Sequence, residues 1–251
     1  MRTNTTRQRA LADETAIGTM CNLASPLGAE TLGQCGYDFI VLDLQHGENG
    51  IDGVQVLMQA LSTTPATPLV RVTANSAIQI QRVLDLGAYG VIVPFINNRQ
   101  EAEEIVKNAF YPPLGSRSWG PTRAMMYAGN DYFAGSSQEI IALPMLESAD
   151  GLANAKEILE VDGISGCFVG PTDLNISLGH TPDGPLASDT EEGIAEILKI
   201  TQDLGKIAAI HAISIEDAKK RSEQGFRLIT VAADTRLLRL GAQQTLSALR
   251  A

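Results

Sequence analysis

The stretch DFIVLDLQH, residues 38–46, decides the fold. Its apolar residues show no alternation with polar ones, which is typical of a strand buried on both faces of a parallel sheet. The run ends in polar side chains, Asp43 and His46. Because neighbouring parallel strands need a crossover between them, usually a helix, the flanking sequence should supply further strands separated by helices.

Seven more runs of this kind occur, each followed by residues with helical spacing. They are AIGTMCNL (16–23), PLVRV (68–72), GVIVPFI (90–96), IIALPMLE (140–147), GCFVGPTDL (166–174), KIAAIHAI (206–213) and FRLITVAAD (226–234). Eight strand–helix units in 251 residues match a (β/α)8 TIM barrel in count and size. The rival is a doubly wound sheet, but NLASPLG follows the first strand where that fold has GxGxxG. We therefore predict one barrel domain over residues 1–251.

Composition and charge narrow the class of protein. The chain is 44% hydrophobic and 19% charged, as ordinary globular proteins are. Its formal net charge of −10 argues against binding a nucleic-acid backbone. No apolar run approaches the roughly 20 residues of a transmembrane helix, and three cysteines without a CxxC pair fit a reducing compartment. We expect a cytoplasmic protein without nucleic-acid or membrane partners.

Polar side chains stand at the carboxyl ends of most predicted strands. In a barrel these ends meet at one mouth, where active sites are built. The residues are Asp43, His46, Arg71, Glu147, Asp173, His211 and Asp234. An acid–base pair, a cation and several carboxylates therefore converge at one place, and this indicates a catalytic site.

Glu147 and Asp173 end neighbouring strands and have no cysteine beside them. Two oxygen ligands, with positions left for water and substrate, suit Mg²⁺ or Mn²⁺ better than zinc. The alternative is a pair of carboxylates bonded to nearby amides or to an arginine. Spacing alone leaves both interpretations open.

His46 and Arg71 supply the other reactive groups. Histidine moves protons near neutral pH, and the neighbouring Asp43 can fix its tautomer. Arg71 closes an apolar strand and needs an anionic partner. That partner is either Asp43 or Glu147 in a structural bridge, or the carboxylate or enolate of a substrate.

Two further features concern the loops and the lysines. The loop GPTDL (170–174) can present consecutive N–H groups, at Thr172, Asp173 and Leu174, to an anion. The lysines lie in helical patterns or, for Lys206, at the start of a strand, so Schiff-base chemistry in the mouth is disfavoured.

At these residues the sequence resembles the HpcH/HpaI aldolase family, the metal-dependent (class II) pyruvate aldolases such as 4-hydroxy-2-oxoheptanedioate aldolase. The resemblance covers nearly the whole chain and follows the family order. Its motifs are GYDFIVLDLQHG, PLVRV, LDLGAYGVIVPFI, YPPLGSRSWG, MLESADGLAN and VDGISGCFVGPTDLNISLG. It implies a carbon–carbon lyase that reversibly cleaves 4-hydroxy-2-oxo acids to pyruvate, or a close 2-oxo acid, and an aldehyde.

The resemblance also implies a role for each residue. Glu147 and Asp173 would hold a divalent cation, Mg²⁺, Mn²⁺ or Co²⁺. His46, supported by Asp43, would be the base, and Arg71 would stabilise the enolate of the bound oxo acid.

The same resemblance implies how substrate and subunits are held. The amides of the loop formed by Gly170, Pro171, Thr172, Asp173 and Leu174 would bind the substrate carboxylate. Asp85 would reach the active site of a neighbouring subunit. The family forms homo-hexamers, trimers of dimers, in which the C-terminal helix is exchanged between partners.

The acceptor end of the site departs from the family. A family aromatic appears as Met20, and a hydrophobic aldehyde-pocket position appears as His211. With Arg117 and Arg123 from the irregular segment 111–137, they predict a polar pocket for short hydroxylated or carboxylated aldehydes. The alternative is that His211 bonds a backbone carbonyl and both arginines form surface ion pairs.

Two other functions fit the same barrel. A CoA-ester lyase of the citrate-lyase superfamily would use the same metal and enolate, but it needs a basic groove that a chain of net charge −10 does not indicate. A non-catalytic barrel that binds oxo acids is the second alternative.

Overall fold

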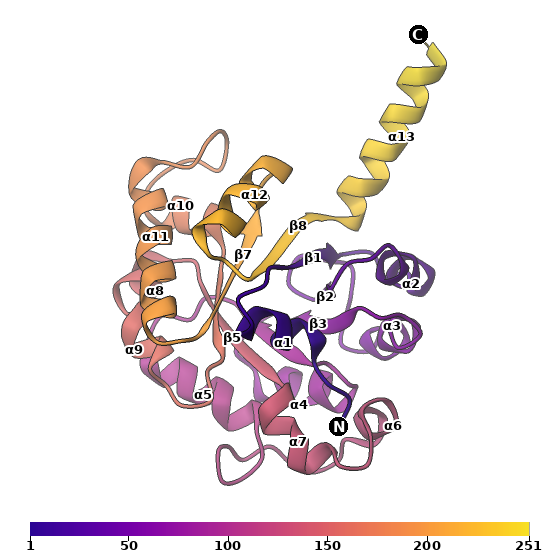
Figure 1. Ribbon diagram of the computed structural model, residues 1–251, viewed down its shortest axis with the longest axis vertical. Helices are drawn as coiled ribbons and strands as arrows, with labels where there is room; N and C mark the ends of the chain where they lie inside the picture. Colours follow the sequence, from indigo (N-terminus) through magenta and orange to yellow (C-terminus); the bar gives the residue numbers. More distant parts are fainter. Residues whose placement is uncertain (251) are drawn as a thin grey trace.

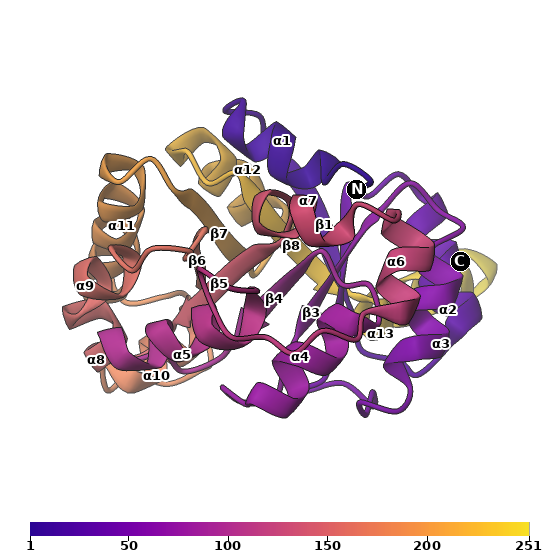
Figure 2. The same ribbon diagram turned by 90° about the horizontal axis from the view of Figure 1, so that it is seen from below.

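The computed structural model describes residues 1–250 and confirms the predicted barrel. Eight parallel strands close in chain order, with β1 paired to β8, and helices surround them (Figure 2). The strands are β1 Ala16–Cys21, β2 Phe39–Asp43, β3 Thr67–Arg71, β4 Gly90–Val93, β5 Ile141–Leu146, β6 Gly166–Val169, β7 Ile207–Ala212 and β8 Leu228–Ala233. Every residue of β2 and β5 is buried, as runs without alternation predict.

The helices follow the strands as the crossover rule requires. Those before β5 are α1 Thr5–Leu11, α2 Pro26–Gln34, α3 Val54–Leu61, α4 Ala77–Asp85, α5 Arg99–Ala109, α6 Thr122–Ala128 and α7 Tyr132–Glu139. Those after β5 are α8 Ala149–Ala153, α9 Ala155–Leu159, α10 Pro171–Ser177, α11 Ser188–Asp203, α12 Ile215–Gln224 and α13 Asp234–Arg250. Segment 111–137, expected to be irregular, thus contains α6 and most of α7.

The N-terminal segment covers the amino-terminal end of the barrel. Asn4 Nδ2 donates to the carbonyl of Glu139 at 2.8 Å and to that of Tyr89 at 3.3 Å, just before β5 and β4. The Thr6 hydroxyl donates to the carbonyl of Asp38, just before β2, at 3.0 Å. Lys206, immediately before β7, is also at this end, so it lies away from the mouth as predicted.

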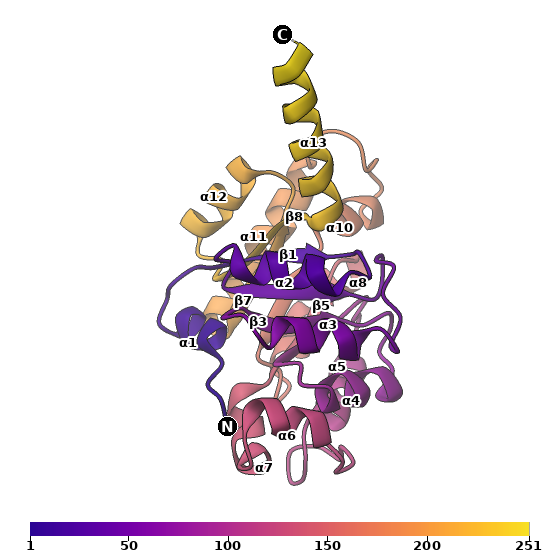
Figure 3. The same cartoon turned by 90° about the vertical axis from the view of Figure 1, so that its right-hand side faces the viewer.

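Helix α13 projects away from the barrel (Figures 1 and 3). Of its described residues only Asp234 is buried, and leucines along it are exposed, such as Leu238 at 68% and Leu249 at 79%. Among residues 1–250, no helix combines the length and apolar character needed to cross a membrane.

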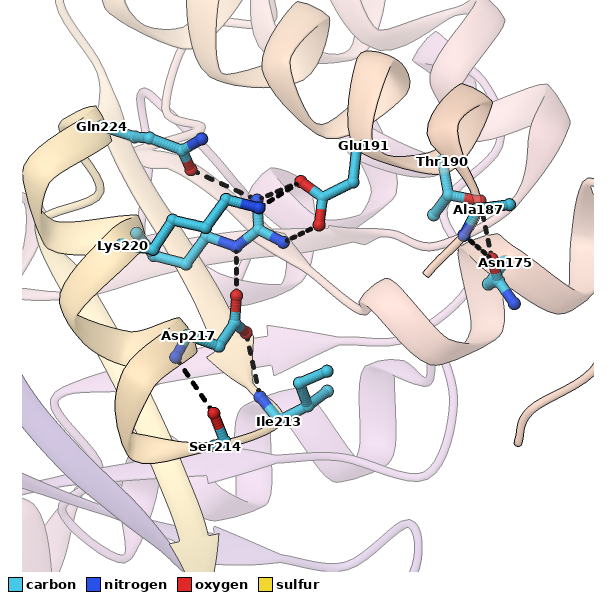
Figure 4. A network of polar contacts seen from close by, with 10 residues as sticks. Asn175, Ala187, Thr190, Glu191, Ile213, Ser214, Asp217, Lys220 and Gln224 are labelled. Atoms are coloured by element: carbon cyan, nitrogen blue, oxygen red, sulfur yellow. Dashed lines mark hydrogen bonds and ion pairs between the residues drawn. The ribbon is translucent and has the colours of Figure 1, made fainter. Parts of the chain in front are cut away.

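A buried arginine joins two helices of the outer ring. Arg221 on α12 is fully buried and forms a two-pronged ion pair with Glu191 on α11, at 2.8 and 2.9 Å (Figure 4). Its Nε lies 2.9 Å from Asp217, whose other oxygen accepts the backbone N–H of Ile213 after β7. Lys220 contacts Glu191 from the solvent side at 2.9 Å. The network therefore connects α11, α12 and the end of β7.

Replacing the buried member of this network should destabilise the protein. Arg221→Ala leaves Asp217 without its cation and Glu191 with only the exposed Lys220, and it removes a large packed side chain. We therefore expect a loss of about 2–4 kcal/mol in the free energy of unfolding. Lys220→Ala, at the exposed edge of the same network, should cost less than about 1 kcal/mol. Chemical denaturation of both variants measures this, and equal losses would contradict the assignment.

Candidate active site

A cavity of about 280 Å³ opens at the carboxyl ends of the strands. It brings together five of the residues predicted from strand ends: Asp43, His46, Arg71, Asp173 and His211. Its other lining residues are Met20, Asn22, Met145, Phe168, Gly170, Pro171, Thr172 and Ala233. Residues from β1, β2, β3, β5, β6, β7 and β8, or from just after them, thus converge on one small space.

Asp43 and Arg71 form the rigid part of the site. Strands β2 and β3 pair these two residues directly, and the guanidinium donates Nε to Oδ1 at 2.9 Å and Nη2 to Oδ2 at 2.7 Å. Asp43 also accepts the backbone N–H of Gln45 at 3.0 Å and of His46 at 3.3 Å. Of the partners left open for Arg71, the structure contains the bridge to Asp43. The carboxylate holds the turn that carries His46 through its backbone.

Glu147 presents one carboxylate oxygen without a partner. Oε1 accepts the backbone N–H of Phe95 at 2.9 Å, whereas Oε2 is buried and has no hydrogen-bond partner within residues 1–250. Burial raises the pKa of Glu147 to about 7, and the nearby charge of Asp173 adds to this shift. Beside it Gly170 leaves room, since a Cβ there would lie 2.5 Å from Oε2. A buried oxygen without a donor, next to a second carboxylate, fits a site for a divalent cation.

A strained loop aims the Phe95 amide at Glu147. Phe95 has φ +51°, in the left-handed region that a side chain as large as phenylalanine rarely adopts. Asn97 Nδ2 donates to the carbonyl of Phe95 at 3.1 Å, and the Asn97 Oδ1 accepts the hydroxyl of Ser148. Strain of this kind persists where the surrounding structure holds it in place, and it concentrates at functional sites. Asn97 therefore fixes the loop that orients Glu147.

Asp173 lies in the first turn of α10, directly after β6. Gly170 is the N-cap and Pro171 the first helical residue, so the free amides of this turn are those of Thr172 and Asp173. The predicted third donor, the N–H of Leu174, is already bonded to the carbonyl of Gly170 at 3.0 Å. The anion cradle is thus smaller than the sequence predicted.

His211 lines the cavity from β7. Its Nδ1 lies 2.9 Å from the hydroxyl of Thr230, the residue paired with it on β8. Burial, and then the positive charge of Arg71, lower the pKa of His211 to about 4. The imidazole is therefore neutral near physiological pH.

Two arginines predicted for the acceptor pocket lie elsewhere. Arg117 is buried and donates to Asp85 at 2.6 Å and to the hydroxyl of Tyr132 at 3.1 Å. Arg123 donates to two carbonyls at the ends of α3 and α4. No residue of segment 111–137 lines the cavity of its own chain, so this part of the prediction was wrong. The sequence could not show that both guanidiniums turn toward buried partners.

Asp85 does not reach the cavity within one chain. It ends α4 and faces a broader depression of about 720 Å³, whose lining includes Arg82 and Arg123. The carbonyl ends of α3 and α4 point into this region, where Arg123 already bonds them. We assign the chemistry to the smaller cavity, since the reactive side chains meet there.

Sequence reasoning missed two contributors. Asn22 follows β1 and lines the cavity, and the strand-end rule applied to β1 would have found it. The role of the Phe95 amide could not be predicted, because no residue type in this segment indicates that the backbone adopts a left-handed conformation at Phe95.

A closed (β/α)8 barrel with paired carboxylates, an arginine and a histidine at its mouth defines a barrel enzyme with its site in the usual place. The chain belongs to the HpcH/HpaI aldolase/citrate lyase family, whose model matches residues 17–240. It is 37% identical, over 94% of both chains, to the hydroxypyruvate/pyruvate aldolase of Rhizorhabdus wittichii. It is 34% identical to the 5-keto-4-deoxy-D-glucarate aldolase of Escherichia coli, over 93% of this chain and 91% of that one.

Among solved structures, a HpcH/HpaI aldolase/citrate lyase family protein from Burkholderia cenocepacia superimposes with a TM-score of 0.92. The two are 31% identical, and the match covers 99% of this chain and 100% of the other. The predicted family and the predicted fold are therefore confirmed.

The ionised form of Glu147 should destabilise the metal-free protein. Its pKa rises from 4.5 to about 7 on folding, so the penalty is absent below pH 4.5 and complete above pH 7. In EDTA, Glu147→Gln should therefore gain up to about 3 kcal/mol in unfolding free energy at pH 8, and about 1 kcal/mol or less at pH 5. Denaturation at both pH values measures this, with the exposed Glu104→Gln as control. A gain that does not depend on pH would contradict the assignment.

Removing the Asn97 side chain should weaken cation binding. Asn97→Ala keeps the backbone but releases the loop that aims Phe95 at Glu147, and outer partners of this kind are worth about 10–100-fold in metal affinity. Calorimetric titration with Mn²⁺ measures the dissociation constant, and thermal unfolding checks the fold. Asn108→Ala, an exposed asparagine near the end of the helix α5 that follows this loop, is the control. A constant within twofold of the wild-type value would show that the loop does not orient Glu147.

Proposed function

We propose that this protein is a metal-dependent aldolase that reversibly cleaves 4-hydroxy-2-oxo acids to pyruvate, or a close 2-oxo acid, and an aldehyde. The observation that carries the proposal is the buried, unpartnered oxygen of Glu147, near Asp173 and directly beside Gly170. Gly170 and Asp173 line the cavity that also contains Arg71 and His46. The names of the relatives, which are aldolases for hydroxypyruvate or pyruvate and for 5-keto-4-deoxy-D-glucarate, support the same reaction class.

Glu147 and Asp173 would hold the cation, Mg²⁺, Mn²⁺ or Co²⁺. When bound, such an ion polarises the 2-oxo group as a Lewis acid. Among residues 1–250 there is no group of three or more His, Cys, Asp or Glu side chains that would enclose it. Coordination by only two carboxylates favours a cation that also accepts water and substrate oxygens.

Arg71 would stabilise the negative charge of the reaction, and His46 would transfer the proton. Arg71, held by Asp43 on the Nε and Nη2 side, keeps Nη1 to stabilise the negative charge that develops on the substrate oxygen as the C3–C4 bond breaks. His46 takes the proton from the C4 hydroxyl, and in the synthetic direction it helps to remove a C3 proton. Asp43 supports His46 through the backbone of its turn.

The substrate carboxylate would lie at the loop of Gly170, Pro171, Thr172, Asp173 and Leu174. The free amides of Thr172 and Asp173 supply its donors. His211, on the neighbouring strand β7, completes the substrate-binding set. The reactants are thus small molecules, an oxo acid and an aldehyde.

We also propose a cytoplasmic homo-hexamer, a trimer of dimers, in which partners exchange α13. The exposed leucines of the projecting helix support an exchanged contact. The side chain of Asp85 is 22% exposed and does not line the 280 Å³ cavity of its own chain. It is then available to the active site of a neighbouring subunit.

Exchange of the C3 protons of pyruvate for deuterium tests the function, because it needs no knowledge of the aldehyde. The protein should catalyse exchange with Mg²⁺ or Mn²⁺ and lose it in EDTA. Asp173→Asn should abolish exchange, since a neutral amide of similar size replaces a charged ligand. His46→Ala should slow cleavage of 4-hydroxy-2-oxo acids by about 10²–10⁴, the usual worth of a positioned base.

The outcomes separate the alternatives. Exchange that persists in EDTA or in folded Asp173→Asn would exclude the metal assignment. Pyruvate binding without exchange would indicate a barrel that binds oxo acids but has no lyase activity. A loss of less than tenfold in His46→Ala would assign the proton transfer to another group.

A further inference from the structure

Asp234 is the one polar strand-end residue that neither the cavity nor the proposed reaction uses. It follows β8 directly and begins α13, and it is the only buried residue of that helix within residues 1–250. The lining of the 280 Å³ cavity includes its neighbour Ala233 but not Asp234 itself. Because a buried carboxylate must be supplied with hydrogen-bond donors, the contacts of Asp234 indicate which part of the structure depends on it.

An irregularity at the end of β8 turns Asp234 away from the cavity. The pairing of β8 with β1 shifts by one residue just before Met20, which pairs with Ala233, so β8 contains one extra residue here. Ala232 lies at this bulge with φ +62°, in the left-handed region that residues with a side chain rarely adopt. Bulges bend a strand and change the direction of the side chains beside them. The end of β8 therefore presents Ala233 to the cavity and Asp234 to the loop after β1.

The carboxylate of Asp234 joins the start of α13 to the loop after β1. Its Oδ1 accepts the backbone N–H of Asn22 at 3.0 Å, and its Oδ2 accepts that of Leu23 at 2.9 Å. Oδ1 also accepts the N–H of Thr235, in the first turn of α13, at 2.7 Å. The positive end of the helix dipole further stabilises the carboxylate at this place. Asp234 therefore holds the backbone of Asn22, a residue that lines the cavity.

The loop after β1 in turn holds the turn that carries His46. The carbonyl of Asn22 accepts the N–H of Glu48, two residues after His46, at 2.7 Å. The side-chain amide of Asn49 donates to the carbonyl of Cys21 at 3.1 Å, so a second hydrogen bond joins the same two loops. The turn is thus held at its far end by the loop after β1, just as the carboxylate at the end of β2 holds its near end.

We propose that Asp234 is a positioning residue for the proton transfer, because through the loop after β1 it holds the turn that carries His46. The role in the reaction rests on the proposed function, whereas the contacts do not. The hydrogen bonds of Asp234 lead to the loops after β1 and β2, whereas Glu147 and Asp173 follow β5 and β6. Loss of Asp234 should therefore impair the proton transfer and leave the affinity for the cation unchanged.

Backbone hydrogen–deuterium exchange, followed by mass spectrometry, tests the contacts without any turnover. In Asp234→Ala we expect about tenfold faster exchange in segments 21–24 and 44–49, the usual effect of losing one or two hydrogen bonds, and no change in segment 170–174. Glu216→Ala is the matched control, since it removes an exposed carboxylate from the first turn of α12, and it should change none of these segments. Unchanged exchange of segment 44–49 in folded Asp234→Ala would overturn the proposal.

A double-mutant cycle tests the link to His46. Asp234→Ala should lower kcat for cleavage of a 4-hydroxy-2-oxo acid with Mn²⁺ by about 10- to 100-fold, because a small misplacement of a reacting group has an effect of this size. The dissociation constant of Mn²⁺, measured by calorimetric titration, should stay within about twofold of the wild-type value. In a His46→Ala background the same substitution should lower kcat by less than about twofold, because the group that it positions is absent.

Asp234→Asn keeps one acceptor oxygen and nearly the same shape, so it should lose less activity than Asp234→Ala, and it replaces that variant if Asp234→Ala does not fold. Equal losses of kcat in the wild-type and His46→Ala backgrounds would show that Asp234 does not act through His46. A loss of Mn²⁺ affinity in parallel with kcat would show a general disturbance of the mouth instead. Wild-type protein that neither cleaves oxo acids nor exchanges the C3 protons of pyruvate would contradict the proposed function, and the amide exchange would still decide whether Asp234 holds the turn.

Discussion

A single buried carboxylate, that of Asp43, organises the mouth of the barrel. It has no solvent exposure and accepts two bonds from Arg71 and two from the backbone that leads to His46. An ionised group so deeply buried is tolerable only when donors surround it. Those donors come from β3 and from the turn after β2. The hydrogen bonds that stabilise the Asp43 carboxylate therefore fix the positions of the Arg71 guanidinium and of His46 together. The arrangement of the site thus follows from the need to supply hydrogen-bond donors to one buried carboxylate.

The barrel and most of its mouth were predictable from the sequence. Apolar runs without alternation indicate buried parallel strands, and parallel strands place their carboxyl ends together. Glu147, Asp173 and His211 could therefore be assigned to one end of the barrel from the sequence alone. Leu174 shows the limit of this reasoning. The sequence predicted a free N–H at Leu174 in the loop GPTDL, but this N–H donates to the carbonyl of Gly170 in the first turn of α10.

The direction of side chains in irregular segments could not be predicted from the sequence. Arg117 and Arg123 lie in a segment rich in Pro, Gly and aromatic residues, where neither helical nor strand spacing indicates which way a side chain points. Arg117 turns to Asp85 and Tyr132 because a buried guanidinium needs acceptors, and the Asp85 carboxylate and the Tyr132 hydroxyl supply them at 2.6 and 3.1 Å. The rings of Tyr111 and Tyr132 also lie 4.8 and 5.6 Å from the guanidinium carbon. The Phe95 amide depends on a φ of +51°, which propensity would assign to glycine or asparagine.

The closure of the barrel floor by the first residues has a consequence for synthesis on the ribosome. Asn4 bonds to Glu139, 135 residues further along the chain, so this partner emerges only after β1 to β4 have been made. The starts of β2 and β4, which Thr6 and Asn4 also contact, emerge earlier, so the segment can acquire its partners only one after another. The contact with Glu139 therefore forms last, and the amino-terminal end of the nascent barrel stays incompletely covered while β1 to β4 emerge.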